Sequence, residues 1–236
     1  KIEYFDSFLI VIFSIIIYAI ASVAFFTIAP FIFFLIMVNG KNSSKYIINF
    51  CRFMLYAFGC RIKVHGKFPL DETYVIMANH VSFLDVFVIP SVFGFDKKFS
   101  AIAAAKNFKI PIYASILKKM KVVSIDRSNR EQSIKGVQQA ERVLKEHNYH
   151  IVVLPEGTRT LNGKISNLKK GGFHLAVNTK SNILPIITKG LFEIKPRNRW
   201  YIVPGTIDIY IGDVIQTQGK TVDDLLDETT QIFNSY

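Results

Sequence analysis

The strongest constraint on the fold is an alternation of short apolar runs with amphipathic stretches between residues 74 and 188. Each apolar run has the length of a buried strand, and the stretches between the runs repeat apolar residues at helical spacing. This order predicts an α/β domain with a largely parallel sheet flanked by helices. The expected strands are 74–78, 99–103, 122–125, 149–154 and 183–188, and the expected helices are 84–92, 112–119, 130–147 and 172–178.

Further elements are predicted on both sides of this alternation. Residues 44–58 form an amphipathic pattern that begins at a serine N-cap, Ser43 or Ser44, and ends at Gly59. A strand is expected at 61–65 and a late strand at 206–211. Thr221 is a suitable N-cap for a final helix.

The N-terminal segment is apolar over an unusual length. No charged residue occurs between Ser7 and Asn39, and the apolar run exceeds the roughly 20 residues that cross a bilayer. Pro30 is expected to kink or break this helix. We therefore expect residues 1–40 to be a membrane anchor and 41–236 a cytoplasmic domain. The anchor is either a tilted transmembrane span that ends near Ala29 or a re-entrant helical hairpin.

The net charge of +11 is concentrated directly after the apolar segment, with Lys41, Lys45, Arg52, Arg61 and Lys63. Positive residues beside a membrane segment favour the cytoplasmic side, which predicts that the body of the protein lies on the cytoplasmic face of the inner membrane. Basic surfaces also bind anionic lipids. A nucleic-acid partner is not expected, because no zinc-ligand or RNA-binding motif is present. The two cysteines have no metal-binding spacing, so no metal site is expected.

The first candidate site is Asn79-His80-Val81-Ser82-Phe83-Leu84-Asp85, directly after the strand predicted at 74–78. In α/β folds, reactive loops follow the carboxyl ends of strands. An imidazole can accept a hydroxyl proton near neutral pH, and a carboxylate on its other nitrogen would fix the tautomer. Asn79 would position the loop, polarise a carbonyl or serve as a plain turn residue. Ser82 is interpreted as a helix N-cap rather than a nucleophile, because no G-x-S-x-G motif is present.

The second candidate site is the polar turn Pro155-Glu156-Gly157-Thr158-Arg159, after the strand predicted at 149–154. Arginine can grip a phosphate through two hydrogen bonds. Glu156 would bind a substrate hydroxyl or hold Arg159 in place. Further cations that follow strands or precede a helix are candidates for the same anion site: Lys106, Arg127, Lys169 and Lys170.

Together these blocks resemble the bacterial 1-acylglycerol-3-phosphate O-acyltransferases and the wider glycerolipid acyltransferase family. The resemblance covers about residues 60 to 215. It rests on four blocks in family order: Asn79-His80…Asp85, Lys106…Pro111 with Ile125-Asp126-Arg127, Leu154-Pro155-Glu156-Gly157-Thr158-Arg159, and Leu184-Pro185-Ile186.

The resemblance implies an enzyme that transfers a fatty acyl group to the sn-2 hydroxyl of lysophosphatidic acid and forms phosphatidic acid. His80 would be the general base and Asp85 its partner. Arg127 and Arg159 would bind the acceptor phosphate, Glu156, Gly157 and Thr158 would shape that site, and Lys106 and Lys169 would assist. The donor would be acyl-CoA or acyl-carrier protein, with no metal or cofactor.

Three alternatives stay open at the level of sequence. In the first, the same enzyme chemistry would use another lysolipid as the acceptor, such as a lyso-ornithine lipid or a lysophospholipid in remodelling. A non-catalytic, membrane-anchored lipid-binding module would keep the basic surface without turnover. A lipid hydrolase would use water in place of the acceptor.

Overall fold

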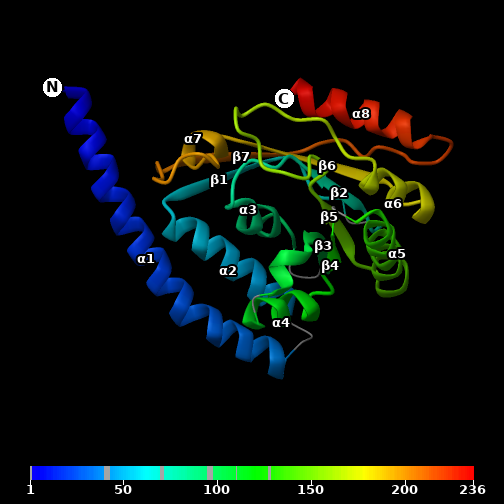
Figure 1. Cartoon of the computed structure of the whole chain (residues 1–236), viewed down its shortest axis with the longest axis horizontal. Helices are drawn as coiled ribbons and strands as arrows, with labels where there is room; N and C mark the ends of the chain where they lie inside the picture. Colours follow the sequence, from blue (N-terminus) through cyan, green and yellow to red (C-terminus); the bar gives the residue numbers. More distant parts are fainter. Residues whose placement is uncertain (1, 40–42, 70–71, 95–97, 110, 127–128) are drawn as a thin grey trace.

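The computed structural model of the chain describes residues 2–39, 43–69, 72–94, 98–109, 111–126 and 129–236. Seven strands form one sheet in the order β1-β7-β6-β2-β5-β3-β4. Every neighbouring pair is parallel except β6 with β7. The prediction of an α/β fold with a largely parallel sheet is therefore confirmed (Figure 1). The strands are β1 (Cys60–His65), β2 (Val75–Ala78), β3 (Phe99–Ala104), β4 (Val123–Ile125), β5 (His150–Val153), β6 (Ile183–Lys189) and β7 (Gly205–Ile211).

Helices cover both faces of the sheet. The described helices are α1 (Ile2–Val38), α2 (Ser43–Ala57), α3 (Asp85–Ser91), the 3-10 helix η2 (Ala105–Lys109), α4 (Pro111–Lys119), α5 (Arg130–His147), α6 (Gly171–Thr179), α7 (Leu191–Ile194) and α8 (Val222–Ser235). One apolar core joins the sheet to α1, α2 and α3, and a second joins its other face to α5, α6 and α8. Side chains alternate between these cores: Ile76 and Val152 enter the first, and Met77 and Val153 enter the second.

Side-chain caps and a glycine stop define several helix ends. α5 begins after Asn129, whose side chain accepts a hydrogen bond from the Gln132 N–H. α8 begins after Thr221, and the reciprocal bonds of Thr221 and Asp224 form a complete capping box. The residue before α2 lies outside the described ranges, and Ser43 is already helical. Gly59 follows α2 with a left-handed φ of 72°, which accounts for the predicted stop.

The N-terminal helix differs from both sequence readings, because it passes Pro30 without ending. α1 continues to Val38, and α2 then runs back beside it (Figure 1). A proline removes one N–H and bends a long helix, but packing along one side can keep the helix continuous. A buried stripe provides that packing, with Ser14, Ile17, Ala21 and Ile36 at helical spacing. The predicted end near Ala29 is wrong.

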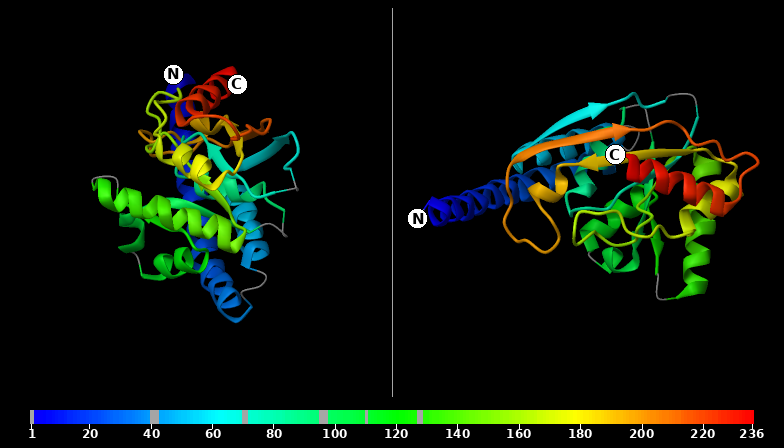
Figure 2. Two further views of the ribbon diagram at one scale, coloured as in Figure 1. Left: turned by 90° about the vertical axis from the view of Figure 1, so that its right-hand side faces the viewer. Right: turned by 90° about the horizontal axis from the view of Figure 1, so that it is seen from above.

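The rest of α1 is exposed and apolar. Most of the large hydrophobic side chains that the described residues expose belong to this helix, including Phe13, Ile16, Phe26 and Phe34. The segment Phe8–Val38 is long and apolar enough to cross a membrane. Its first turns project beyond the rest of the body (Figure 2). The division into an anchor of residues 1–40 and a domain of residues 41–236 stays a prediction, because α1 shares a core with the sheet.

Candidate active site

The candidate residues gather at one edge of the sheet. The neighbouring strands β2, β5, β3 and β4 are parallel, so their carboxyl ends meet at the same edge. His80 follows β2, the turn that begins at Pro155 follows β5, and the exposed Lys106 lies in η2 after β3. Arg127, predicted after β4, lies outside the described residues. The sheet thus places three of the predicted blocks side by side.

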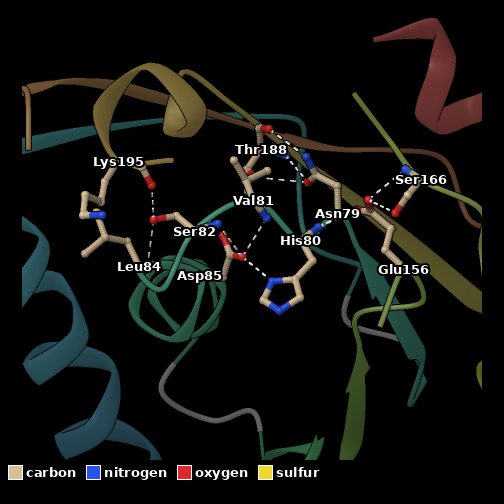
Figure 3. A network of polar contacts seen from close by, with 10 residues as sticks. All are labelled: Asn79, His80, Val81, Ser82, Leu84, Asp85, Glu156, Ser166, Thr188 and Lys195. Carbon is tan, nitrogen blue, oxygen red and sulfur yellow. Dashed lines mark hydrogen bonds and ion pairs between the residues drawn. The ribbon is translucent and has the colours of Figure 1, made fainter. Parts of the chain in front are cut away.

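His80 and Asp85 form a direct pair (Figure 3). His80 Nδ1 lies 2.6 Å from Asp85 Oδ2, and the two side chains are 22% and 4% exposed. An ionised carboxylate only accepts, so Nδ1 carries the proton and donates it to Asp85. The unprotonated Nε2 is then available to accept a proton from a substrate. The geometry is therefore that of an oriented general base.

The carboxyl group of Asp85 is held by its own turn. Oδ2 also accepts hydrogen bonds from the N–H groups of Val81 (2.9 Å) and Ser82 (3.1 Å). Oδ1 is buried and has no hydrogen-bond partner among the described residues. Burial raises the pKa of this carboxyl, and its bonds to His80, Ser82 and Val81 oppose that rise.

Two buried polar side chains brace the turn from behind. The amide of Asn79 donates to the Thr188 carbonyl and accepts from the Thr188 N–H and hydroxyl, which joins the end of β2 to β6. Asn79 therefore positions the loop, and its side chain is taken up by this contact. The Ser82 hydroxyl donates to the Lys195 carbonyl at 2.6 Å and is buried.

The predicted N-cap role of Ser82 is wrong, because Leu84 occupies the N-cap position of α3. Ser82 Oγ instead accepts the Leu84 N–H, two residues on, in a local turn. A serine so placed, with its oxygen buried, is not a free nucleophile. This agrees with the interpretation from the missing G-x-S-x-G motif.

Glu156 joins two loops of the site through its carboxylate. Its Oε1 accepts the His80 N–H at 2.6 Å, and its Oε2 accepts the N–H and the hydroxyl of Ser166 at 2.9 and 2.8 Å. Both oxygens are thereby occupied and the residue is buried. The expectation that Glu156 holds Arg159 is not met, because the described residues show no bond between the two, and the binding of a substrate hydroxyl by Glu156 stays a prediction. The carboxylate instead joins the His80 loop to the loop after β5 (Figure 3).

Replacing Glu156 with glutamine is expected to weaken both the fold and the site. An amide offers only one accepting oxygen, so its NH₂ group faces either the His80 N–H or the Ser166 donors. Hydrogen bonds to a buried charge contribute roughly 1.5–3 kcal/mol, and we expect a loss of that size in the free energy of unfolding. Denaturation and initial rates would measure both effects. Ser166→Ala, which removes one hydroxyl, is the milder control; equal stability of wild type and E156Q would contradict the scaffold role.

The other residues of the turn after β5 lie beside a cavity and against the backbone of His80. Gly157 has a left-handed φ of 77°, which favours glycine, and Thr158 is exposed. The Thr160 N–H donates to the His80 carbonyl at 2.9 Å, so the loop holds the backbone of the base from both sides. Arg159, between them, is half-buried.

Lys195 is a nearby cation that the sequence motifs did not indicate. Burial lowers the pKa of this lysine, and the positive charges of Arg159 and Arg199 lower it further. The Lys195 carbonyl accepts a hydrogen bond from the Ser82 hydroxyl, so Lys195 lies against the turn that carries Asp85. Because it lies 115 residues beyond His80 and outside any recognisable block, only the folded chain brings it here.

Two cavities adjoin this edge. One, of about 540 Å³, is lined by Glu156, Thr158 and Lys169 and by the first residues of α6, Gly171 and Gly172. A helix N-terminus carries partial positive charge, so it would stabilise an anion at this wall, and the anion site itself stays a prediction. The other, of about 480 Å³, is almost wholly apolar and lies between α1, α2, α3 and α4. Phe83 and Val86, just after His80, form part of its wall.

The family follows from a comparison of the sequence with family models. The model described as Acyltransferase matches residues 61–189, more than half of the chain, and this segment includes both His80 and Arg159. The chain belongs to the Acyltransferase family. The predicted family resemblance is thereby confirmed.

Individual relatives of this chain carry a more specific name. A 1-acyl-sn-glycerol-3-phosphate acyltransferase of Limnanthes douglasii is 27% identical over 78% of this chain and 64% of its own length. One of Pseudomonas aeruginosa is 29% identical over 73% of this chain and 67% of its own length. The chain thus spans about two thirds of the length of these curated relatives.

A solved structure supports the fold. The crystal structure of the 1-acyl-sn-glycerophosphate (LPA) acyltransferase PlsC from Thermotoga maritima matches with a TM-score of 0.80 at 22% identity. The match covers 97% of this chain and 95% of that one. Among the described residues, no three His, Cys, Asp or Glu side chains cluster as metal ligands. That the protein works without a metal or cofactor stays a prediction.

Proposed function

We propose that this protein transfers a fatty acyl group from acyl-CoA or acyl-carrier protein to the sn-2 hydroxyl of lysophosphatidic acid, which forms phosphatidic acid. The observation that carries the proposal is the His80–Asp85 pair, 2.6 Å apart at the carboxyl end of β2, within the segment that matches the acyltransferase family. The names of the relatives supply the acceptor.

The pair accounts for the chemistry in one displacement. His80 Nε2 takes the proton of the acceptor hydroxyl while Nδ1–H donates to Asp85, whose charge stabilises the imidazolium. The hydroxyl oxygen attacks the thioester carbonyl, a new C–O bond forms and the C–S bond breaks. The thiolate then takes the proton back from His80. The step needs neither a metal ion nor a covalent acyl-enzyme.

The apolar cavity beside α3 is the proposed site for an acyl chain. Its walls include Phe25 of α1, Phe50 of α2 and Phe87 of α3, and it begins at Phe83, three residues after the base. An acyl chain there would lie between the exposed helix α1 and the helices α2, α3 and α4. Substrates drawn from a membrane would then reach His80 without crossing water.

The acceptor phosphate is proposed to bind on the polar side of His80. Arg159 has the planar donor group that phosphate binding favours, and Lys106 and Lys169 follow or flank the same strand ends. Arg127 keeps its predicted phosphate role from the sequence. Gly157 and Thr158 shape the wall, and Glu156 fixes the loop that carries it.

Replacing Arg159 with alanine is expected to raise the KM for lysophosphatidic acid about 10- to 100-fold, with a smaller change in kcat. Charge-assisted hydrogen bonds contribute roughly 1.5–3 kcal/mol, and phosphate binding persists in the transition state. Steady-state kinetics with varied acceptor would measure the change. Lys164→Ala, an exposed cation of the same loop, is the matched control. An unchanged acceptor KM would count against the phosphate role.

The exposed apolar face of α1 suggests association with a membrane. We propose the inner membrane, with the catalytic domain on its cytoplasmic face, because basic residues follow the apolar segment. Membrane lipids are the proposed partners of that face. Since α1 packs along the body from Ser14 to Ile36, we favour a helix that lies in the membrane surface over one that leaves the body.

A panel of acceptors tests the proposed substrate. We expect product from lysophosphatidic acid and little from a monoacylglycerol, a lyso-ornithine lipid or lysophosphatidylcholine, which lack a terminal phosphate for Arg159. Mass spectrometry of the lipid products would measure the preference. Equal rates with acceptors that lack the phosphate would favour another lysolipid acyltransferase.

A further inference from the structure

The segment between α7 and β7 has an unusual composition for a surface turn. Residues 195–201, which we call the tryptophan loop, read Lys-Pro-Arg-Asn-Arg-Trp-Tyr and contain three cations and no acid. Trp200 is the single tryptophan of the chain, and its side chain is 56% exposed. Arg197 is also exposed, at the tip of the turn. The loop thus exposes both a large aromatic side chain and a cation.

The tryptophan loop is held firmly from within. The Lys195 ammonium donates to the carbonyls of Pro196 and Arg199, and the Arg199 guanidinium donates to the carbonyls of Glu193 and Ile194. The same guanidinium lies 4.7 Å over the ring of Tyr201. These bonds satisfy the inner cations with backbone oxygens, so the exposure of Trp200 and Arg197 does not result from a loose turn.

The loop is bonded to the apolar helix. The Tyr18 hydroxyl donates to the Trp200 carbonyl at 2.7 Å. Ser14 Oγ donates to the Ile202 carbonyl at 2.9 Å and accepts the Ile202 N–H at 3.2 Å. In Figure 1 the chain after α7 turns toward α1. Ile15, which follows Ser14 in α1, exposes an apolar side chain beside this contact.

We propose that the tryptophan loop is a second membrane-binding element, which places Trp200 among the headgroups of an anionic bilayer and pairs Arg197 with lipid phosphates. Tryptophan concentrates at the boundary between hydrocarbon and water, where its ring is apolar and its N–H reaches polar groups. Arginine binds phosphate and anionic lipid surfaces. Trp200 therefore suits the boundary between hydrocarbon and water, and Arg197 suits the layer of lipid phosphates.

The bonds to α1 fix the depth of this contact. Ser14 and Tyr18 lie within the apolar segment Phe8–Val38, so the loop moves with it. If residues 14–18 lay at the centre of a bilayer, Arg197 and Arg199 would enter hydrocarbon, where arginine is unfavourable. With the tryptophan loop at the headgroups, this part of α1 lies at the membrane surface. The loop thereby sets the orientation of the whole body.

Trp200 itself supplies the test, because the emission of the full chain comes from this one tryptophan. The protein would be bound to vesicles of phosphatidylcholine with 30% phosphatidylglycerol, with bromine on the lipid chains either near the headgroup or near the chain end. We expect a shift of emission to shorter wavelength and stronger quenching by the shallow bromine. Unquenched emission from membrane-bound protein would overturn the proposal and favour a soluble partner. Stronger quenching by the deep bromine would overturn the headgroup position.

A pair of charge reversals tests the role of Arg197. Each well-placed cation changes binding to anionic lipid about fivefold, so R197E is expected to lose at least that factor of the preference for phosphatidylglycerol. Arg142→Glu makes the same change in charge on α5, across the molecule from α1, and is expected to behave as wild type (Figures 1 and 2). Equal loss in both variants, or none in either, would contradict a specific headgroup contact.

The readout is independent of the proposed reaction. Quenching of Trp200 without any acyl transfer would keep the membrane contact and remove the enzymatic proposal. Turnover of lysophosphatidic acid by a protein whose Trp200 stays in water would keep the enzymatic proposal and overturn the membrane contact.

Discussion

Replacing His80 with alanine is expected to lower the rate of acyl transfer by about 10³-fold or more. The imidazole is the proposed acceptor of the hydroxyl proton, and a positioned general base contributes roughly 10²–10⁴ to a rate. The substitution removes only the imidazole and its bond to Asp85. The bonds that join residue 80 to Glu156 and Thr160 use its backbone, so the loop around Glu156 is expected to keep its position. Initial rates of phosphatidic acid formation would measure the loss.

The control for this variant is lipid binding. H80A keeps α1 and the tryptophan loop, so we expect unchanged association with vesicles and a melting temperature within a few degrees of wild type. Normal activity of H80A would contradict the proposed mechanism. Loss of activity together with loss of folding would instead be checked with His80→Gln, which retains a polar side chain of similar reach.

Replacing Asp85 with asparagine is expected to lower kcat about 10²- to 10³-fold with little change in either KM. The asparagine oxygen can take the place of Oδ2 and keep the three hydrogen bonds, because Oδ1 has no partner among the described residues. The tautomer of His80 then survives, but the charge that stabilises the imidazolium is lost. Steady-state kinetics with both substrates varied would separate kcat from KM. A variant with full kcat would show that the carboxylate charge is dispensable.

The same variant is expected to melt at an equal or higher temperature than wild type near neutral pH. Burial raises the pKa of Asp85, so the folded protein keeps this proton at a pH where the unfolded chain has released it. Asp85 therefore stabilises the fold at low pH, and this stabilisation disappears as the pH rises through the raised pKa of the folded state. The advantage of D85N should shrink toward pH 4, near the ordinary value of about 3.9. Melting curves between pH 4 and 8 would measure this; a growing advantage at acid pH would contradict it.

The elements of the sheet were predictable because their signals are local. Val75–Ala78 and His150–Val153 are short, mainly apolar runs, and Thr221 is a strong N-cap, so periodicity and capping predict the type of these elements and most of their boundaries. α1 was the exception. Local chemistry at Pro30 predicted a break, but packing of Ser14, Ile17 and Ala21 against the body favours one continuous helix.

The candidate site was only partly readable from the sequence. Spacing indicated the His80–Asp85 pair, because five residues can close a turn on themselves. The partners of Glu156 could not be inferred, since His80 and Ser166 meet it across the sheet edge at separations of 76 and 10 residues. Thr188, which binds Asn79, is 109 residues away. A charge that points to a phosphate and a charge that braces a loop look alike until the chain is folded.

The most direct test of the account is formation of phosphatidic acid by the purified full chain. Lysophosphatidic acid would be supplied in lipid with long-chain acyl-CoA, and in parallel with acyl-carrier protein, and the products followed by mass spectrometry. The account predicts phosphatidic acid with at least one donor and none above background with H80A. Thioester cleavage at the same rate without acceptor, or product that does not depend on His80, would contradict it.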